Sequence, residues 1–159
     1  MSRRNFIFLL LSLISLSILT SGCINYVLAR PESVLTKLER EINRAKEDRI
    51  IELYSEEVWV ATPGNPSGRI LPKDSLASFY SDFFELYEDI SIELHSEETL
   101  RDSLEATMTV SFTLEYSYEG KRYYDIGEGS ILLSGIDNHW QICGERNNPI
   151  LSLFEPAEM

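Results

Sequence analysis

The stretch that decides the fold is residues 104–116, LEATMTVSFTLEY. Apolar side chains occupy every second position of this stretch, and polar side chains occupy the positions between them. Successive side chains of a β-strand point to opposite faces, so this alternation predicts one long strand with a covered face and a polar face. The side chains predicted to face inward are all apolar: Ala106, Met108, Val110, Phe112 and Leu114.

More strands are predicted on either side of this one. Three neighbouring stretches have strand-like sequences: 90–95, 123–133 and 140–145. Glu119-Gly120 predicts the hairpin turn that joins the long strand to the next one. Within that next strand, Gly127 and Gly129 indicate a bulge or a sharp bend. The second half of the chain is therefore predicted to form a four-stranded antiparallel sheet.

Helices are predicted in the first half of the chain. The clearest one has apolar side chains at three- and four-residue steps: Leu76, Phe79, Tyr80, Phe83, Phe84 and Tyr87. This periodicity is typical of an amphipathic helix, and its many aromatic side chains have to pack against the sheet. Periodicity also predicts helices over about 32–46 and 47–55, and a short strand at 58–61. The Pro- and Gly-rich residues 62–68 predict a turn.

The N-terminus carries an export signal. Arg3 and Arg4 precede an apolar run over residues 6–19, and small residues then lead to Cys23. This arrangement resembles a prokaryotic lipoprotein signal, in which the peptide is cut before the cysteine and the cysteine carries diacylglyceride. An uncleaved membrane anchor is the alternative, although a spanning helix needs about 20 apolar residues. Either outcome places the remaining chain outside the cytoplasm.

Charge restricts the partners of the mature chain. All 26 acidic residues and 12 of the 14 basic ones follow residue 22, so the mature net charge is near −14. Nucleic acid is an unsuitable partner, because its binding needs cationic side chains against the phosphates. Anionic lipid headgroups should also repel the domain, so we expect the lipid to hold it at the membrane. With Cys23 acylated, Cys143 is predicted to be a small structural thiol.

The predicted order is two helices, a short strand, a third helix and four antiparallel strands. It resembles the nuclear-transport-factor-2-like (NTF2-like) superfamily, which includes the SnoaL-like domains. The stretches that carry the resemblance are 63–69, 76–84, 87–91, 125–133 and 140–142. The resemblance implies an α+β fold, in which a strongly curved antiparallel sheet forms a cone around the helices with a pocket at its open end. Members include isomerases, cyclases, hydrolases and dehydratases, and many others only bind ligands or proteins.

The chain is accordingly divided into four parts. They are a lipoprotein signal peptide (1–22), a lipidated tether (23–32), one α+β domain (33–146) and an irregular C-terminal tail (147–159). No catalytic motif of the superfamily matches this sequence, so the resemblance carries over no catalytic residue.

Glu128 is the one candidate catalytic residue that the strands suggest. In one register Glu128 follows Tyr124 and Ile126 onto the apolar face, where burial would raise the pKa of its carboxyl group. In the other arrangement the neighbouring glycines kink the strand and leave Glu128 solvated, or paired with Arg122 or Lys121. Both arrangements are open at the level of the sequence.

Five aromatic side chains either line the mouth of a pocket or belong to an ordinary core: Tyr54, Trp59, Phe83, Tyr87 and Phe112. His95 and His139 are predicted to lie at the surface. No metal site is predicted, because no His, Cys or carboxylate residues have the spacing of metal ligands. No cofactor is predicted either.

The predicted function is that of a lipid-anchored extracytoplasmic protein of the cell membrane or outer membrane. Its non-catalytic domain would bind a small apolar ligand or an envelope protein. The alternative is a small cofactor-independent enzyme of the cyclase or isomerase type that uses Glu128 with a tyrosine. The row of hydroxyl side chains from Thr107 to Thr113 suits either a homodimer contact through the sheet or a solvated surface.

Overall fold

A computed structural model describes residues 29–153 of the chain. Its helices are α2 (Glu32–Ile42), α3 (Glu47–Ile51), α4 (Lys73–Leu86) and α5 (Pro149–Ser152). Its strands are β1 (Tyr54–Ala61), β2 (Arg69–Pro72), β3 (Glu88–Asp102), β4 (Glu105–Tyr118), β5 (Lys121–Ile136) and β6 (His139–Arg146). The predicted signal peptide and Cys23 lie outside the described residues. Among the residues that are described, no helix is long and apolar enough to cross a membrane.

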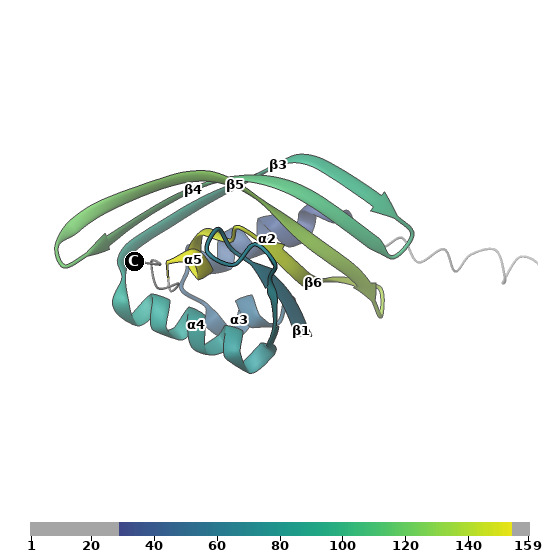
Figure 1. Cartoon of the computed structure of the whole chain (residues 1–159), viewed down its shortest axis with the longest axis horizontal. Coiled ribbons are helices and arrows are strands. Elements are labelled where there is room, and N and C mark those ends of the chain that lie inside the picture. Colours follow the sequence, from purple (N-terminus) through teal and green to yellow (C-terminus); the bar gives the residue numbers. More distant parts are fainter. Residues whose placement is uncertain (1–28, 154–159) are drawn as a thin grey trace, which may run out of the picture.

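The strands of the described domain form one curved sheet in the order β2-β1-β6-β5-β4-β3. Figure 1 shows this sheet arching over the helices, which lie on its concave side. Strands β3 to β6 pair antiparallel in sequence order, which confirms the predicted four-stranded unit. The α+β class with helices packed on a curved sheet is confirmed as well.

The N-terminal strands differ from the prediction. β1 begins at Tyr54 rather than at residue 58, and it lies parallel to β6. β2 follows the predicted turn and pairs antiparallel with β1, although no strand was predicted there. Helix α3 ends at Ile51, earlier than predicted, because the chain enters β1 three residues later. Pairing with distant strands therefore overrides the helical periodicity around residue 54.

The long strand β4 has the predicted faces. Ala106, Met108, Val110 and Leu114 are buried on its concave face, and Phe112 is half-buried there. On the other side of this core, α2 and α4 bury one stripe each. These stripes consist of Val34, Leu35, Leu38 and Ile42 in α2 and of Leu76, Tyr80 and Phe83 in α4. Burial of these apolar side chains between the layers is the main force that holds helices and sheet together.

Gly127 and Gly129 form no bulge, which was one of the two arrangements predicted for them. The pairing of β4 with β5 is continuous from Glu105↔Ser134 to Tyr118↔Lys121. The two glycines instead allow close approach on the concave face. A Cβ atom at Gly129 would lie 2.5 Å from the carbonyl oxygen of Arg146. The absence of a side chain lets the end of β6 cross closely over β5.

The tail that was predicted to be irregular contains the short helix α5. The Asn148 side chain caps it, because its Oδ1 accepts hydrogen bonds from the backbone N–H groups of Ile150 and Leu151 at 2.8 and 3.1 Å. Pro149 occupies the first turn, where the missing N–H is not needed. Ile150 and Leu151 are buried, so this segment belongs to the folded domain.

Candidate functional site

Glu128 lies on the convex face of the sheet and is exposed. Glu128 pairs with Ser111 of β4. Ser111 lies between Val110 and Phe112, which face the apolar side, so Ser111 and Glu128 both face the other side of the sheet. The register set by the hairpin turn therefore carries Tyr124, Ile126 and Glu128 together to the outside, and the arrangement that buried Glu128 is wrong. The residue also borders a surface groove of about 300 Å³ between β5 and α5. A buried acid or base at this position is not supported.

The five aromatic candidates do not gather around one pocket. Tyr54 and Phe83 are fully buried in the core. Trp59 lies under the guanidinium of Arg146, at 5.6 Å from the ring centroid. Tyr87 packs its ring against Phe83 and two tyrosines of β4, Tyr116 and Tyr118.

Phe112 alone of the five borders the cavity on the concave side of the sheet. This cavity lies between α2 and strands β3 to β5, and its volume is about 30 Å³, which is room for roughly two water molecules. Its walls are mainly apolar: Leu38, Ile42, Ile92, Leu94, Val110, Phe112 and Ile131. Residues 145–150, from the end of β6 into α5, line another side of the cavity.

Glu145 brings a carboxyl group to this apolar cavity. It is only 2% exposed, and both of its oxygens accept hydrogen bonds. The Tyr54 hydroxyl donates to Oε1 at 3.0 Å, and Asn148 Nδ2 donates to Oε2 at 2.8 Å. The hydroxyl groups of Tyr54 and Tyr80 lie 2.8 Å apart, which extends the network to α4. Within the described domain no ion pair reaches Glu145, and the neighbouring Arg146 side chain covers Trp59 instead.

Burial controls the ionisation of this network. It raises the pKa of the Glu145 carboxyl group to about 7, although the hydrogen bonds from Asn148 and Tyr54 act in the opposite direction. Burial and the nearby Glu145 carboxylate also raise the pKa values of the Tyr54 and Tyr80 phenols. Both phenols therefore remain protonated near neutral pH, where Glu145 changes its charge. A buried carboxyl group of this kind is a candidate functional group.

Sequence reasoning missed Glu145 because strict alternation assigns it to the outside. Trp140 and Ile142 face the core, so regular pairing would turn Glu145 away from it. The pairing of β5 with β6 shifts at Cys143, since Leu133 pairs with Ile142 whereas Leu132 pairs with Gly144. This extra residue is a β-bulge, and it reverses the faces of the residues that follow. The one local signal for the bulge is Gly144, which directly follows Cys143 inside the strand.

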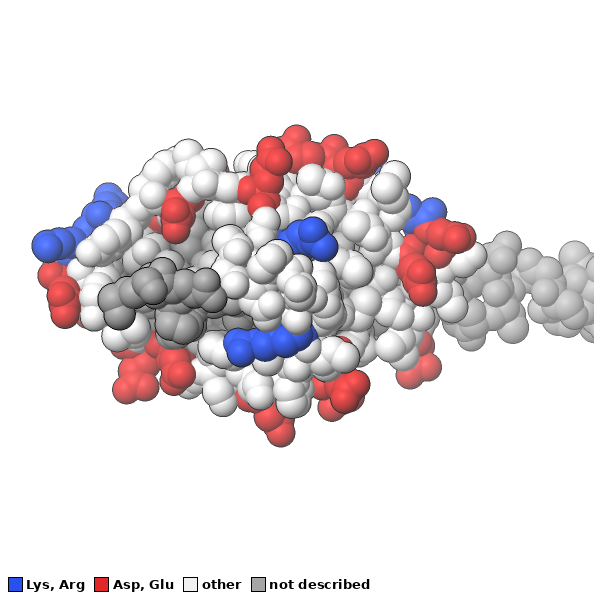
Figure 2. Space-filling view, viewed as in Figure 1, with Lys and Arg blue, Asp and Glu red and all other residues white. Residues whose placement is uncertain are grey.

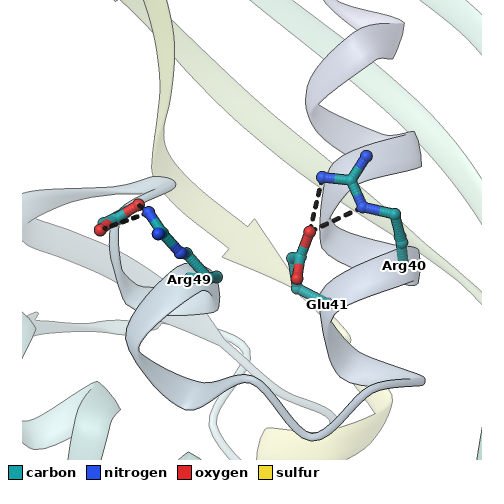
Figure 3. A network of polar contacts seen from close by, with 4 residues as sticks. Arg40, Glu41 and Arg49 are labelled. Atoms are coloured by element: carbon teal, nitrogen blue, oxygen red, sulfur yellow. Dashed lines mark hydrogen bonds and ion pairs between the residues drawn. The ribbon is translucent and has the colours of Figure 1, made fainter.

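Other polar groups of the described domain form no comparable site. Arg40 Nε donates to Glu41 at 2.6 Å, and Arg49 pairs with Glu52 at 2.9 Å. Figure 3 shows these two local pairs apart from each other, and both border a surface groove between α2 and α3. Acidic side chains are much more frequent than basic ones on the face shown in Figure 2. His95 and His139 are exposed, as predicted, and burial raises the pKa of the half-buried Cys143 thiol. No group of acidic, His or Cys residues within 29–153 could hold a metal ion.

Comparison with protein-family models and with curated proteins finds no match. Solved structures do match in fold. A ketosteroid isomerase-like protein from Erwinia carotovora atroseptica superposes with a TM-score of 0.65 at 21% identity, over 77% of this chain and 95% of that one. An NTF-2-like protein of unknown function from Shewanella oneidensis gives 0.58 at 16% identity, over 72% and 92%.

A conserved protein from Planctomyces limnophilus gives a TM-score of 0.66 at 13% identity, over 73% of this chain and 90% of that one. The fold is therefore NTF2-like, as the order of elements predicted. Identities this low define the fold and leave the function to the site itself.

Proposed function

We propose that this protein is a membrane-anchored extracytoplasmic binding domain. Its ligand is a small, mainly apolar molecule with one hydrogen-bond donor, and the donor pairs with Glu145. The observation that carries the proposal is the buried carboxyl group of Glu145, which is the one acidic residue that lines a mainly apolar cavity of the described domain. Binding sites of this kind combine apolar walls with a few placed polar groups.

The hydrogen bonds of Glu145 support binding rather than chemistry. Tyr54 and Asn148 hold the two oxygens in place, so the carboxyl group is oriented but not free to move toward a substrate. A carboxylate oxygen has two lone pairs, so each oxygen can still accept one more hydrogen bond from a ligand. The cavity of about 30 Å³ has to widen for a ligand larger than water. The wall formed by residues 145–150 is the part expected to move, because its only regular element there is the four-residue helix α5.

The test uses three small probes that share an aromatic body: phenol, toluene and benzoate. At pH 8 we expect methyl signals of Leu38, Ile92 and Ile131 to shift with phenol at about tenfold lower concentration than with toluene, because a hydrogen bond to a charged acceptor contributes about 1.5 kcal/mol or more. Benzoate should not bind, since two carboxylates would meet in the cavity. NMR titration of the methyl groups measures all three.

The control for this titration is Glu145→Gln. It should reduce the preference for phenol over toluene and leave toluene binding unchanged. Binding of benzoate as strong as that of phenol would contradict the proposal, and so would a lack of any shift in the cavity methyl groups.

A cofactor-independent acid–base enzyme is the second candidate, with Glu145 in place of Glu128. The observation in its favour is the pKa of about 7 for a carboxyl group next to two protonated phenols. Such an enzyme should exchange the α-hydrogens of a small ketone, for example cyclohexanone, with D₂O. Exchange that is faster with the parent protein than with Glu145→Gln would favour catalysis. Equal exchange would favour the binding domain.

The anchor is tested at Cys23. We expect Cys23→Ser to leave the precursor uncleaved and to abolish incorporation of labelled palmitate, because the thiol is the site of acylation. Labelling of cells that express either form, followed by gel analysis, measures this directly. Ser21→Ala is the matched control, and it should be processed normally. Equal palmitate incorporation into parent and Cys23→Ser would refute the lipid anchor.

A further inference from the structure

The described chain begins at one defined end of the domain. The indole N–H of Trp140 donates to the carbonyl oxygen of Ala29 at 2.6 Å. Trp140 is itself buried, and the guanidinium of Arg101 lies 5.2 Å from its ring centroid. The position at which the N-terminal segment joins the domain is therefore fixed by the core.

Two turns lie at this same end, as Figure 1 shows for the β3–β4 and β5–β6 connections. They are direct neighbours, because the backbone N–H of Gly135 donates to the carbonyl oxygen of Leu104 at 2.7 Å. Gly135 also pairs with Trp140. Three large apolar side chains in or next to these turns are exposed: Leu104 in the β3–β4 turn by 56%, Leu100 near the end of β3 by 62% and Ile136 at the end of β5 by 44%. We call these three side chains the tether-end patch.

The length of the tether determines which part of the domain stays near the membrane. Five residues lie between Cys23 and Ala29. An extended chain spans about 3.5 Å per residue-to-residue step, so Ala29 lies within roughly 20 Å of the lipidated cysteine. The 14 residues of β4 span about 45 Å. The tether therefore keeps the tether-end patch on the side of the domain that is nearest the lipidated cysteine, whereas the β4–β5 turn lies at the other end of β4.

We propose that the tether-end patch contacts the acyl-chain boundary of the bilayer and orients the domain on the membrane. The proposal rests on the lipid anchor of the proposed function. Exposed apolar side chains grouped at one end mark an interaction surface. Their partner is the apolar part of the bilayer, to which side chains of this kind bind by burying area in the interface.

Charge at this end excludes a contact driven by anionic headgroups. Arg30 and Arg101 are outnumbered by the nearby acidic residues Asp102, Glu105 and Asp137. Attraction to anionic lipids requires an excess of basic side chains. The contact should therefore form on uncharged phosphatidylcholine and should not depend on salt.

The test uses the full-length acylated protein in phosphatidylcholine vesicles. With Cys143→Ala as background, a fluorescent nitrobenzoxadiazole probe is attached at Leu104→Cys or, as the matched control, at Ile126→Cys. Ile126 is 68% exposed and lies in the half of the β4–β5 hairpin that is near the β4–β5 turn, whereas Leu104 lies at the other end of this hairpin. We expect brominated phosphatidylcholine to quench the probe at position 104 roughly threefold more than at 126, since only the former reaches the acyl chains.

Two further measurements make the outcomes distinct. Mass spectrometry of the N-terminal peptide reports acylation, and hydrogen exchange of the unlabelled parent should show vesicle protection at residues 100–104 and 134–139 but not at 120–126. An unmodified Cys23 would overturn the anchor and the patch together. Acylated protein with equal quenching and equal exchange at both ends would overturn the patch alone. Quenching at 104 only after addition of phosphatidylglycerol would show a charge contact and would also overturn it.

Discussion

Glu145→Gln is expected to raise the free energy of unfolding by about 3 kcal/mol at pH 8 and to leave it nearly unchanged at pH 4. The pKa of this carboxyl group rises from 4.5 in a free residue to about 7 in the folded domain. Each unit of that rise corresponds to about 1.4 kcal/mol. The ionised carboxyl group therefore destabilises the fold, and glutamine removes the charge.

The direction of the pH dependence follows from proton binding. Between pH 4.5 and 7 the folded state keeps the proton on Glu145, whereas the unfolded state has lost it. The free energy of unfolding of the parent therefore falls as pH rises through this interval, and Glu145 causes no further change above it. Urea unfolding of parent and variant at pH 4, 6 and 8 measures the difference between them.

Glutamine can replace the protonated side chain without leaving a polar group unpaired. Its carbonyl oxygen can accept from Asn148, and its amide can donate to Tyr54, whose hydroxyl then donates to Tyr80. Glu128→Gln is the matched control, because that carboxyl group is exposed on the convex face. It should change the free energy of unfolding by less than about 0.5 kcal/mol at each pH. If the free energy of unfolding depended on pH in the same way for the parent and Glu145→Gln, this would contradict the burial of a carboxyl group without a cationic partner.

Phe83→Ala is expected to lower the free energy of unfolding by about 3–5 kcal/mol, the usual loss for a buried phenylalanine. Phe83 is fully buried where α4 meets the sheet. Its ring packs against those of Phe84 and Tyr87, at centroid distances of 5.4 and 5.2 Å. Alanine would leave a cavity among side chains that cannot all move to fill it. Urea unfolding monitored by circular dichroism measures the loss.

Two controls separate the burial of Phe83 from a general sensitivity of the fold. Leu86→Ala changes an exposed side chain of the same helix, and Thr109→Ala changes the convex face of β4. Each should cost less than about 1 kcal/mol. Comparable losses for Thr109→Ala and Phe83→Ala would mean that the register of β4 is wrong.

The residues that sequence reasoning placed correctly are those governed by local periodicity. The alternation of residues 104–116 predicted β4 and its inward face, and the aromatic stripe near residue 80 predicted α4. These elements could be predicted because burial of one face leaves a repeat of two or about four residues in the chain. The order of such elements was sufficient to predict an NTF2-like α+β fold.

The site depended on contacts that leave no such repeat. The bulge at Cys143 turns Glu145 inward, and the parallel pairing of β1 with β6 brings Tyr54 to it from a position 91 residues away in the chain. Tyr54 itself was assigned to a helix, because the spacing of its apolar neighbours fits a helix. That spacing carries no information about β6, the strand with which Tyr54 pairs in the structure. Sequence alone determined the layers of the domain and its acidic net charge. Only the tertiary structure decided which carboxyl group is buried. The bulge appears as a shift in the pairing of β6 with β5, and this shift reverses the faces of the residues that follow it.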